Sequence, residues 1–493
     1  MSELRTIGRH TLVYGAGIVA SKLVSFIMLP VYTHYLTTAD YGVLELLGTT
    51  IDVIGMIGGI GLAAGVFKHY AEADSDDKRQ KLMSTVTLGS GALSLLIALI
   101  GIAASPMLTR MLFGPDMTPD YFRMFFLIYF FQNLSNLGLA YVQVEEKSGM
   151  FVALNVLKLI LQLSLTIYFV VVLKWSIRGV LVASVISSGL FGLGMAAYTL
   201  KRVGVHFAND VFRRLSRFGA PVAAWTIGSF ILTFSDRYFL NHYSGPGEVG
   251  IYSLAYKFSF LLSTFAVAPF SQIWEPRRFA IAKEPNAGIV YRQMFNYMNV
   301  ALFFGSIGIV LFIRDTLTVV VDPAFVSAYR IVPLLLVTTI LQQWTGYCNF
   351  GLFLRNATHL YAWSALIGVV TALVLNTLLI PHYGMFGAAW ATVIAYAVRF
   401  IPVYLFAQSK YRVDYSWSKV AELALVLGGV MVFRYFADGL RLGMSLLAST
   451  VVLLMATALI YTRMLDNGER AFLRQIIRRP FASRTVVTVQ DVT

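Results

Sequence analysis

Long apolar stretches, separated by short polar segments, run along the whole chain. Each stretch has about the 20 residues that an α-helix needs to cross a bilayer, and none shows the polar–apolar alternation that is typical of membrane β-strands. The pattern predicts an all-α integral membrane protein with about 14 transmembrane helices. The predicted spans are residues 11–36, 42–67, 83–108, 121–143, 150–173, 178–200, 218–240, 249–273, 293–313, 331–352, 360–381, 384–407, 419–437 and 442–462.

The composition excludes other classes of protein. Hydrophobic residues make up 57% of the 493 residues and charged residues 13%, whereas a soluble domain carries about 25% charged residues. A disordered chain would be poor in apolar residues. The net charge of +14 indicates basic cytoplasmic loops rather than a nucleic-acid partner, because lysine and arginine collect in such loops.

Lysine and arginine residues outside the spans are concentrated in alternate loops, on the side of the N-terminus. The positive-inside rule therefore predicts that both termini are cytoplasmic. The N-terminal segment is expected to be a retained first helix, because no small-residue cleavage site follows a short apolar core. Residues 465–493 are expected to form a basic cytoplasmic tail that rests on anionic headgroups.

An internal repeat connects the two halves of the chain. One shift of 208 residues aligns separated places in spans 1–6 with places in spans 7–12. Six spans is an even number, so both halves enter the membrane in the same orientation, and the repeat is parallel. Two such lobes around a central cleft are typical of transporters that work by alternating access. The residues His34, Gly42, Lys147 and Gly179 correspond to His242, Gly250, Arg355 and Gly387.

The repeat also predicts the domain organisation. Spans 13 and 14 fall outside it and form an addition at the C-terminal end. The predicted parts are an N-lobe with helices 1–6 at residues 1–206, a C-lobe with helices 7–12 at 207–413, helices 13–14 at 414–464, and the basic tail at 465–493.

Charged residues inside the spans are the first candidates for a functional site, because such residues usually face a cavity or a partner. Lys22 and Asp52 both lie roughly 15 Å into their spans and are predicted to pair across the first hairpin. Asp236 and Lys257 are predicted to meet in the same way. Successive helix residues point about 100° apart, so Arg237 is expected to face away from Asp236.

Five cations lie in the spans, against only a few acids, and a cleft with surplus positive charge attracts anions such as diphosphate. We expect Lys158 to line the cavity, whereas Arg237 and Arg399 fit a cavity role and snorkelling to the interface equally well. Polar amides in spans 4 and 10 suit sugar hydroxyls or, equally, contacts between helices. The amide candidates are Gln132, Asn136 and Gln343.

Motifs for direct chemistry are absent from the sequence. There is no Walker lysine motif, no HExxH and no pair of cysteines, and the single cysteine Cys348 lies in an apolar run. We therefore expect no cofactor, no metal and no direct use of ATP. Coupling to a proton or sodium gradient is the expected energy source, with Asp52, Asp236 and Glu45 as candidate ion sites.

Several stretches together resemble one known family. They are residues 8–46, Glu146-Lys147, SDRYFL at 235–240, GIYSLAYK at 250–257 and LNTLLIPHYGMFGAAWATVIAY at 375–396. The chain resembles the polysaccharide transporters of the multidrug/oligosaccharidyl-lipid/polysaccharide exporter superfamily, which include O-antigen and exopolysaccharide flippases. The resemblance covers spans 1–12.

This resemblance implies a flippase, not an enzyme. It would move an undecaprenyl-diphosphate-linked oligosaccharide between the leaflets of the bacterial inner membrane, for a surface polysaccharide such as lipopolysaccharide, next to polysaccharide polymerase machinery. The two extra helices are similar to those of lipid II flippases, but a single cation in span 1 argues against lipid II as the substrate. The resemblance assigns the diphosphate or acidic sugars to Lys22, Lys158, Arg237 and Lys257.

Two alternative functions stay open at this point. A cation-coupled multidrug antiporter belongs to the same superfamily, although a surplus of cations in the spans argues against cationic drugs as substrates. A membrane polymerase or ligase would need a catalytic constellation at the periplasmic ends of the helices, where the sequence offers only arginines.

Overall fold

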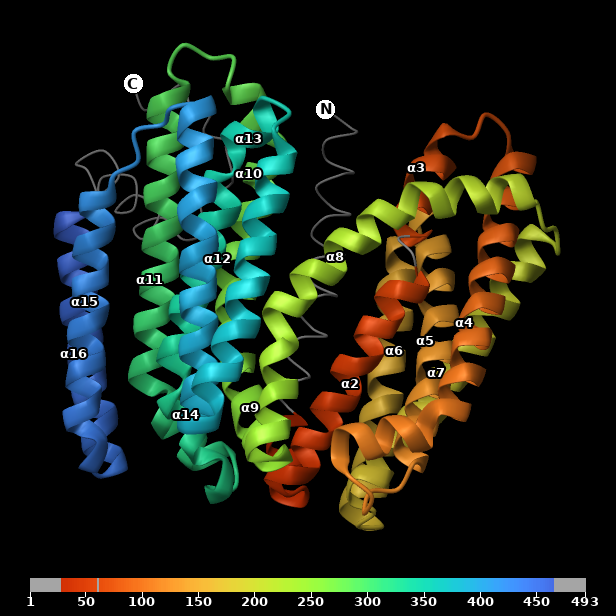
Figure 1. Ribbon diagram of the computed structural model, residues 1–493, viewed down its shortest axis with the longest axis horizontal. Coiled ribbons are helices and arrows are strands. Elements are labelled where there is room, and N and C mark those ends of the chain that lie inside the picture. Colours follow the sequence, from red (N-terminus) through yellow and green to blue (C-terminus); the bar gives the residue numbers. More distant parts are fainter. Residues whose placement is uncertain (1–27, 60–61, 465–493) are drawn as a thin grey trace. The chain divides into compact units, whose positions relative to one another are not determined.

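We describe the protein from a computed structural model, which defines residues 28–59 and 62–464. Within these ranges every regular element is a helix (Figure 1). The predicted all-α fold is therefore confirmed. In the described part, nine helices are long and apolar enough to cross a membrane, or ten if one bent pair counts as a single span. The count of fourteen spans and the layout of the repeat stay predictions.

The helices fall where the apolar stretches predicted them. Short π-helical and 3-10 segments (η1 to η4) continue or connect the α-helices. The elements are α2 (Thr38–Gly59), α3 (Leu62–Glu72), α4 (Asp76–Phe113), α5 (Asp120–Val144), α6 (Ser148–Thr166), η1 (Ile167–Val172), α7 (Ser176–Val203), α8 (Asn209–Ser244), α9 (Pro246–Leu262), η2 (Ser263–Val267), α10 (Ala268–Ile281), α11 (Ala287–Val320), η3 (Pro323–Arg330), α12 (Val332–Cys348), α13 (Phe350–Leu354), α14 (Thr358–Lys410), α15 (Trp417–Phe436), η4 (Ala437–Gly439) and α16 (Leu442–Arg463).

The helix α14 contains two of the predicted spans. Its 53 residues would be about 80 Å long if straight, far more than a bilayer core of about 30 Å. The break lies at Gly384, whose φ of 52° and ψ of −131° are not helical. The Glu248 carboxylate accepts a hydrogen bond from the Met385 backbone amide at 2.9 Å, at the start of the second half. A carboxylate at a helix N-terminus satisfies an otherwise unpaired amide.

The chain divides into two compact units. The first unit contains the described residues of 1–256 together with 320–331 and 362–399; the second contains 257–319, 332–361 and 400–464. The predicted lobe boundary at 206/207 stays a prediction. In the first unit, α4, α5 and α7 pack closely because small residues face their neighbours. A Cβ added at Gly192 of α7 would lie 2.3 Å from the Phe131 carbonyl oxygen of α5, so only glycine permits this approach.

Aromatic rings fill the core of the second unit. The rings of Trp274 and Tyr347 stack with centroids 5.3 Å apart. The buried Arg278 lies beside them, with Nη1 donating to Asn349 Oδ1 at 3.2 Å and Nη2 forming an ion pair with Glu275 at 2.8 Å. The rings fill the space around the guanidinium, while Trp274 Nε1 and Arg278 Nε are buried without a hydrogen-bond partner in the part of the chain that the structure describes.

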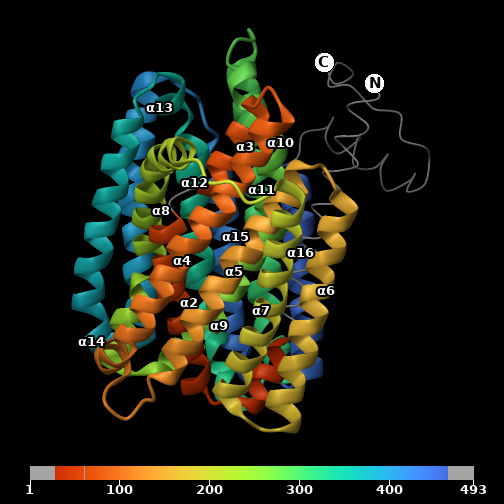
Figure 2. The same ribbon diagram turned by 90° about the vertical axis from the view of Figure 1, so that its right-hand side faces the viewer.

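The helix α8 is longer than a single span needs. Its 36 residues rise about 54 Å, so about 16 of them exceed the hydrocarbon core. Its first part runs across the ends of α4 and neighbouring helices: it is almost horizontal in Figure 1 and is seen down its own axis in Figure 2. The helix then turns into the bundle and carries Asp236 and Arg237.

Candidate functional site

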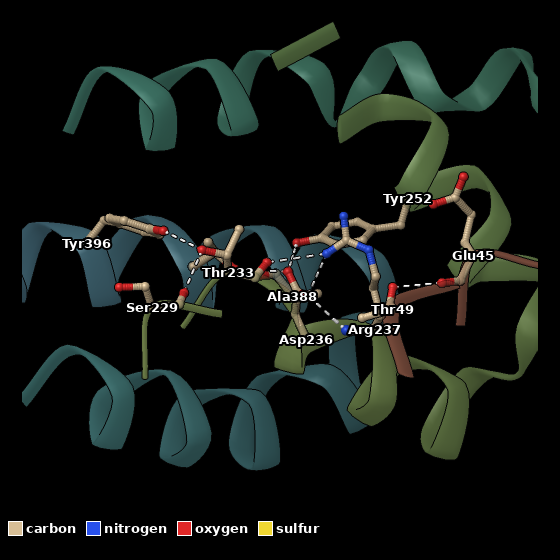
Figure 3. A network of polar contacts seen from close by, with 10 residues as sticks. Glu45, Thr49, Ser229, Thr233, Asp236, Arg237, Tyr252, Ala388 and Tyr396 are labelled. Carbon is tan, nitrogen blue, oxygen red and sulfur yellow. Dashed lines mark hydrogen bonds and ion pairs between the residues drawn. The ribbon is translucent and has the colours of Figure 1, made fainter. Parts of the chain in front are cut away.

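A buried ion pair on α8 is the centre of the candidate site (Figure 3). Asp236 and Arg237 are each only 2% exposed. Arg237 Nη1 lies 3.1 Å from Asp236 Oδ1, and the Arg237 backbone amide donates to the same oxygen at 2.8 Å. The expectation that Arg237 faces away from Asp236 is therefore wrong. The long side chain curls back along its own helix, where Nη1 also donates to the Thr233 carbonyl oxygen at 3.3 Å.

Hydroxyl groups of two further helices lie at the other oxygen of the Asp236 carboxylate. The Tyr252 hydroxyl of α9 donates to Oδ2 at 2.6 Å. The Thr392 hydroxyl of α14 lies 3.4 Å from Oδ2 and also lies 2.9 Å from the Ala388 carbonyl oxygen, so it shares one proton between the two acceptors. The Arg237 guanidinium thus shares one carboxylate with groups from α9 and α14. A charged acceptor strengthens such hydrogen bonds, so Asp236 joins three helices of the first unit.

Aromatic rings surround the Arg237 guanidinium. Its central carbon lies 4.3 Å from the ring centroid of Tyr256, 4.7 Å from that of Phe234 and 5.8 Å from that of Tyr252. Ring faces attract cations, and more strongly where water is excluded. The buried positive charge is therefore held by one carboxylate and by ring faces, while Nε has no hydrogen-bond partner within the described part of the chain.

The sequence positions these groups by helical spacing. Tyr252 and Tyr256 are four residues apart on α9, and Thr392 and Tyr396 are four residues apart on α14, so each pair shares one helix face. One turn from the ion pair, Tyr396 and Thr233 share a hydrogen bond of 3.0 Å. These tyrosines and threonines were missed in the sequence analysis, although the spacing of hydroxyl groups beside SDRYFL could have indicated them. Fully buried alanines let α14 approach closely: Ala388, Ala389, Ala391 and Ala395.

The cluster of Asp236, Arg237, Tyr252 and Thr392, here the Asp236 cluster, has no net charge. Arg237 cannot bind an anion strongly while Asp236 neutralises it, because the carboxylate occupies the guanidinium and offsets its field. Binding of an anion at Arg237 requires that Asp236 first acquires another partner. In this structure Asp236 is the counter-ion of Arg237.

Other predicted residues occupy separate places in the first unit. Lys158 of α6 is half-buried and donates to the Ser135 hydroxyl of α5 at 3.2 Å. Glu45 of α2 is half-buried, and its backbone carbonyl accepts from Thr49 at 2.7 Å. Arg399 of α14 is buried, which favours the interior position over snorkelling.

Three predicted polar residues are exposed on apolar helices. They are Asp52 of α2 and Gln132 and Asn136 of α5, the last two one turn apart on a common face. Within the part of the chain that the structure describes, the Asp52 carboxylate forms no hydrogen bond or ion pair. Polar side chains on a spanning helix rarely face lipid, so we expect these faces to line a space that water can enter. Lys22, the predicted partner of Asp52, lies outside the described residues.

Two predicted site residues belong to the second unit. Lys257 of α9 and Gln343 of α12 are both half-buried. The pairing of Lys257 with Asp236 stays a prediction. No group of three or more histidine, cysteine, aspartate or glutamate side chains that could hold a metal occurs in residues 28–59 and 62–464.

A second buried ion pair was missed in the sequence analysis. Asp315 of α11 and Arg434 of α15 are both buried, and Arg434 Nη2 lies 3.1 Å from Asp315 Oδ1. The Ser445 hydroxyl of α16 accepts from Arg434 Nη1 at 2.7 Å and donates to Asp315 Oδ2 at 2.8 Å. This triad fastens the two last helices to α11. Both ionic residues lie near predicted span ends, where sequence alone suggests exposure.

Comparisons with known proteins agree with this architecture. The lipid II flippase MurJ, in an inward closed conformation, matches with a TM-score of 0.73 and 13% identity, over 92% of this chain and 100% of that chain. An inward-facing multidrug resistance MATE family transporter matches with a TM-score of 0.60 and 15% identity, over 84% and 95%. A transporter of the MOP superfamily from Pyrococcus furiosus gives 0.54 and 15%, over 85% and 96%. At these identities the matches show the fold alone, which this chain shares with these membrane proteins.

Sequence comparison identifies the family. The model of the polysaccharide biosynthesis protein family matches residues 7–282, more than half of the chain. The chain therefore belongs to the polysaccharide biosynthesis protein family. A probable low-salt glycan biosynthesis flippase, Agl15 of Haloferax volcanii, is 22% identical over 256 residues. That match covers 51% of this chain and 53% of the relative, so the chain spans about half the length of the curated relative it matches.

Proposed function

We propose that this protein is a flippase that moves a lipid-linked oligosaccharide across the membrane for polysaccharide biosynthesis. Family membership and the transporter fold support the reaction class. The observation that carries the proposal is the Asp236 cluster. In it, a carboxylate forms an ion pair with a guanidinium inside helices whose other residues are mostly apolar. Such groups in spanning helices are costly and usually serve transport.

The substrate in this proposal is an oligosaccharide on undecaprenyl diphosphate, in the bacterial inner membrane. Its diphosphate is recognised by cations, and its sugars by amides. The exposed Gln132 and Asn136 present donors and acceptors that suit sugar hydroxyls. The proposed diphosphate ligands are Lys22, Lys158, Arg237 and Lys257, and Gln343 is the third proposed sugar ligand.

Ion coupling in this proposal works by exchange at Asp236. A proton or sodium ion that binds the carboxylate weakens its contact with Arg237, and the freed guanidinium then binds the diphosphate in bidentate fashion. Release of the substrate restores the ion pair. The two lobes alternate between the leaflets during this cycle. Asp52 and Glu45 are additional candidate ion sites.

A deletion strain tests the function directly. Lipid-linked intermediates are extracted and identified by mass, and a membrane-impermeant probe reports the leaflet that holds them. We expect a complete lipid-linked oligosaccharide to accumulate on the cytoplasmic leaflet. A normal pool in both leaflets would contradict the flippase proposal. A polymerase defect would instead leave single oligosaccharide units on the outer surface.

Substitution of Arg237 tests the site separately. We expect Arg237→Gln to lower transport per folded molecule at least tenfold, because the side chain loses its charge. Arg434→Gln is a matched control, since Arg434 is also a buried arginine paired with one aspartate. It should lower stability but leave transport per folded molecule within about twofold. Equal losses in both variants would show that the Asp236 cluster has only a structural role.

The fold shared with MATE transporters keeps a drug antiporter as the second candidate. A drug-susceptibility panel on the deletion strain separates the two. Unchanged susceptibility is expected for a polysaccharide flippase. Increased susceptibility to several cationic drugs, without accumulation of a glycan intermediate, would favour the antiporter.

A further inference from the structure

The start of α8 carries an exposed group of three arginines. Arg213, Arg214 and Arg217 are all exposed, and with Asn209 and Asp210 they line a shallow hollow of about 450 Å³. Within residues 28–59 and 62–464, no ion pair engages any of the three guanidinium groups. The first turns of α8 therefore present three arginines beside the single carboxylate of Asp210, a surplus of positive charge that is here called the arginine face.

The opposite side of this segment is fixed to the first unit. Leu215 is fully buried in a core cluster with Val66, Leu82 and Val86. Phe212 packs so closely on α4 that a Cβ added at Gly89 would lie 2.5 Å from its ring. Apolar anchors on one side and arginines on the other make the segment amphipathic. The arginine face therefore keeps a fixed orientation.

The loop before α8 is also held in place. Two hydroxyl groups of α4 bind its backbone: Ser84 donates to the Gly204 carbonyl oxygen at 2.9 Å and accepts from the His206 amide at 2.8 Å. Thr85 accepts from the Ala208 amide at 3.1 Å. These bonds to a spanning helix set the height of the segment at the end of the bundle.

Exposed apolar side chains lie next to the arginine face. Val205 is 70% exposed and Phe207 is 56% exposed, although both belong to the loop at the helix ends. Together with the direction of this part of α8, across the bundle, the pattern is that of a segment lying in the membrane–water interface (Figures 1 and 2). Apolar side chains enter the acyl boundary there, while cations meet the headgroups.

The start of α4 offers a comparison on the same side of the unit. Its three cations are each paired with an aspartate: Lys78 with Asp74 at 3.1 Å, Arg79 with Asp76 at 3.4 Å, and Lys81 with Asp77 at 2.7 Å. Each of these cations therefore has its own acid, whereas the three arginines of the arginine face have only Asp210 beside them and keep a net positive charge.

We propose that the arginine face is a docking site for anionic phospholipid headgroups of the leaflet predicted to be cytoplasmic. Guanidinium groups bind phosphate oxygens in bidentate geometry, and several cations at an interface together attract an anionic leaflet. Three guanidinium groups within five residues can contact one or two phosphodiesters. This site is independent of the proposed transport function and of the Asp236 cluster.

Native mass spectrometry of the full-length protein in detergent tests the proposal. The probe is phosphatidylglycerol, and phosphatidylcholine is the neutral reference. We expect wild-type protein to retain phosphatidylglycerol in preference to phosphatidylcholine, and the preference to fall as ionic strength rises. The variant R213Q/R214Q/R217Q should lose at least tenfold in phosphatidylglycerol affinity. The matched control K78Q/R79Q/K81Q should change it by less than about twofold.

A charge-conserving variant shows whether lost binding comes from lost charge or from misfolding. R213K/R214K/R217K should retain most of the affinity, because point charges still attract the headgroup, while bidentate contacts are lost. Equal retention of phosphatidylglycerol by wild type and R213Q/R214Q/R217Q would overturn the proposal. So would displacement of phosphatidylglycerol by micromolar inorganic pyrophosphate, because the occupant would then be a free phosphate group rather than a phospholipid.

Discussion

Gly42 and Gly250 lie in reciprocal contact where α2 and α9 begin. A Cβ added at Gly42 would fall 1.8 Å from the Pro246 carbonyl oxygen, and one added at Gly250 would fall 2.1 Å from the Thr38 carbonyl oxygen. The 208-residue shift of the internal repeat relates Gly42 to Gly250, and it also relates Thr38 to Pro246. Two equivalent positions that touch each other in this way are expected near a two-fold axis of a parallel repeat.

We therefore expect Gly42→Ala and Gly250→Ala each to force the two helix ends apart by more than about 1 Å. Overpacking of this kind costs roughly 1–3 kcal/mol. Gly48→Ala is the control on α2, because nothing lies within 4 Å of the Cβ it would add. Thermal unfolding of the purified variants is the measurement, and identical unfolding temperatures for all three would contradict the contact.

Tyr252→Phe should destabilise the protein more than Tyr396→Phe. The first removes a hydrogen bond of 2.6 Å to the Asp236 carboxylate, and the second removes one of 3.0 Å to the neutral Thr233 hydroxyl. Hydrogen bonds inside membranes average about 0.6 kcal/mol and reach about 1.7 kcal/mol, and a charged acceptor should place Tyr252 at the upper end. Chemical or thermal unfolding in matched detergent gives the comparison. A larger destabilisation by Tyr396→Phe than by Tyr252→Phe would show that the hydrogen bond from Tyr252 to Asp236 does not contribute the expected stability.

Asp315→Asn should lower the free energy of unfolding by about 3–5 kcal/mol, because it leaves Arg434 buried without its counter-charge. The double variant Asp315→Asn/Arg434→Gln should be less damaged than the sum of its single variants. A double-mutant cycle on unfolding free energies measures the coupling. Limited proteolysis of the Asp315→Asn variant would show whether the chain between α11 and α15 becomes accessible before the rest of the protein unfolds. Simple additivity would mean that the triad does not fasten these helices.

Stability should depend on pH through Glu145, which follows α5. A hydrogen bond of 2.5 Å from the Tyr70 hydroxyl lowers the pKa of Glu145 below its ordinary value of 4.5, against the effect of burial and with help from Lys147. A carboxyl whose pKa is lowered on folding stabilises the fold fully above the unfolded value and loses that contribution as the pH falls through the folded value. Tyr70→Phe should therefore be less stable than wild type at pH 7, and this difference should shrink below about pH 4.5. A pH-independent difference would point to packing rather than to the carboxylate.

The fold could be predicted from sequence because hydrophobicity is a local property. Every predicted span from 42–67 onward has a helix at its place, and even the separation of 360–381 from 384–407 is visible at Gly384. The boundaries shifted by several residues because helices such as α4 and α8 extend beyond the apolar core. Hydropathy contains no information about such extensions.

The candidate site was only partly predictable. Asp236 and Arg237 were identified because a charge inside an apolar span is conspicuous. Their mutual contact was missed, because side-chain length can override the angle between neighbouring residues. Tyr252 and Thr392 were missed because their role depends on α9 and α14 meeting α8, and only the three-dimensional structure establishes which helices meet.

The contact between Asp236 and Arg237 also has an electrical consequence. Moving one elementary charge through 100 mV changes the free energy by about 2.3 kcal/mol. The two residues are neighbours bonded to one another, so they move as a unit of zero net charge. Any displacement of this part of α8 along the membrane normal is therefore insensitive to membrane voltage while the pair is intact. A voltage-dependent step in the transport cycle would accordingly report on bound ions or substrate, or on the moment when this pair separates.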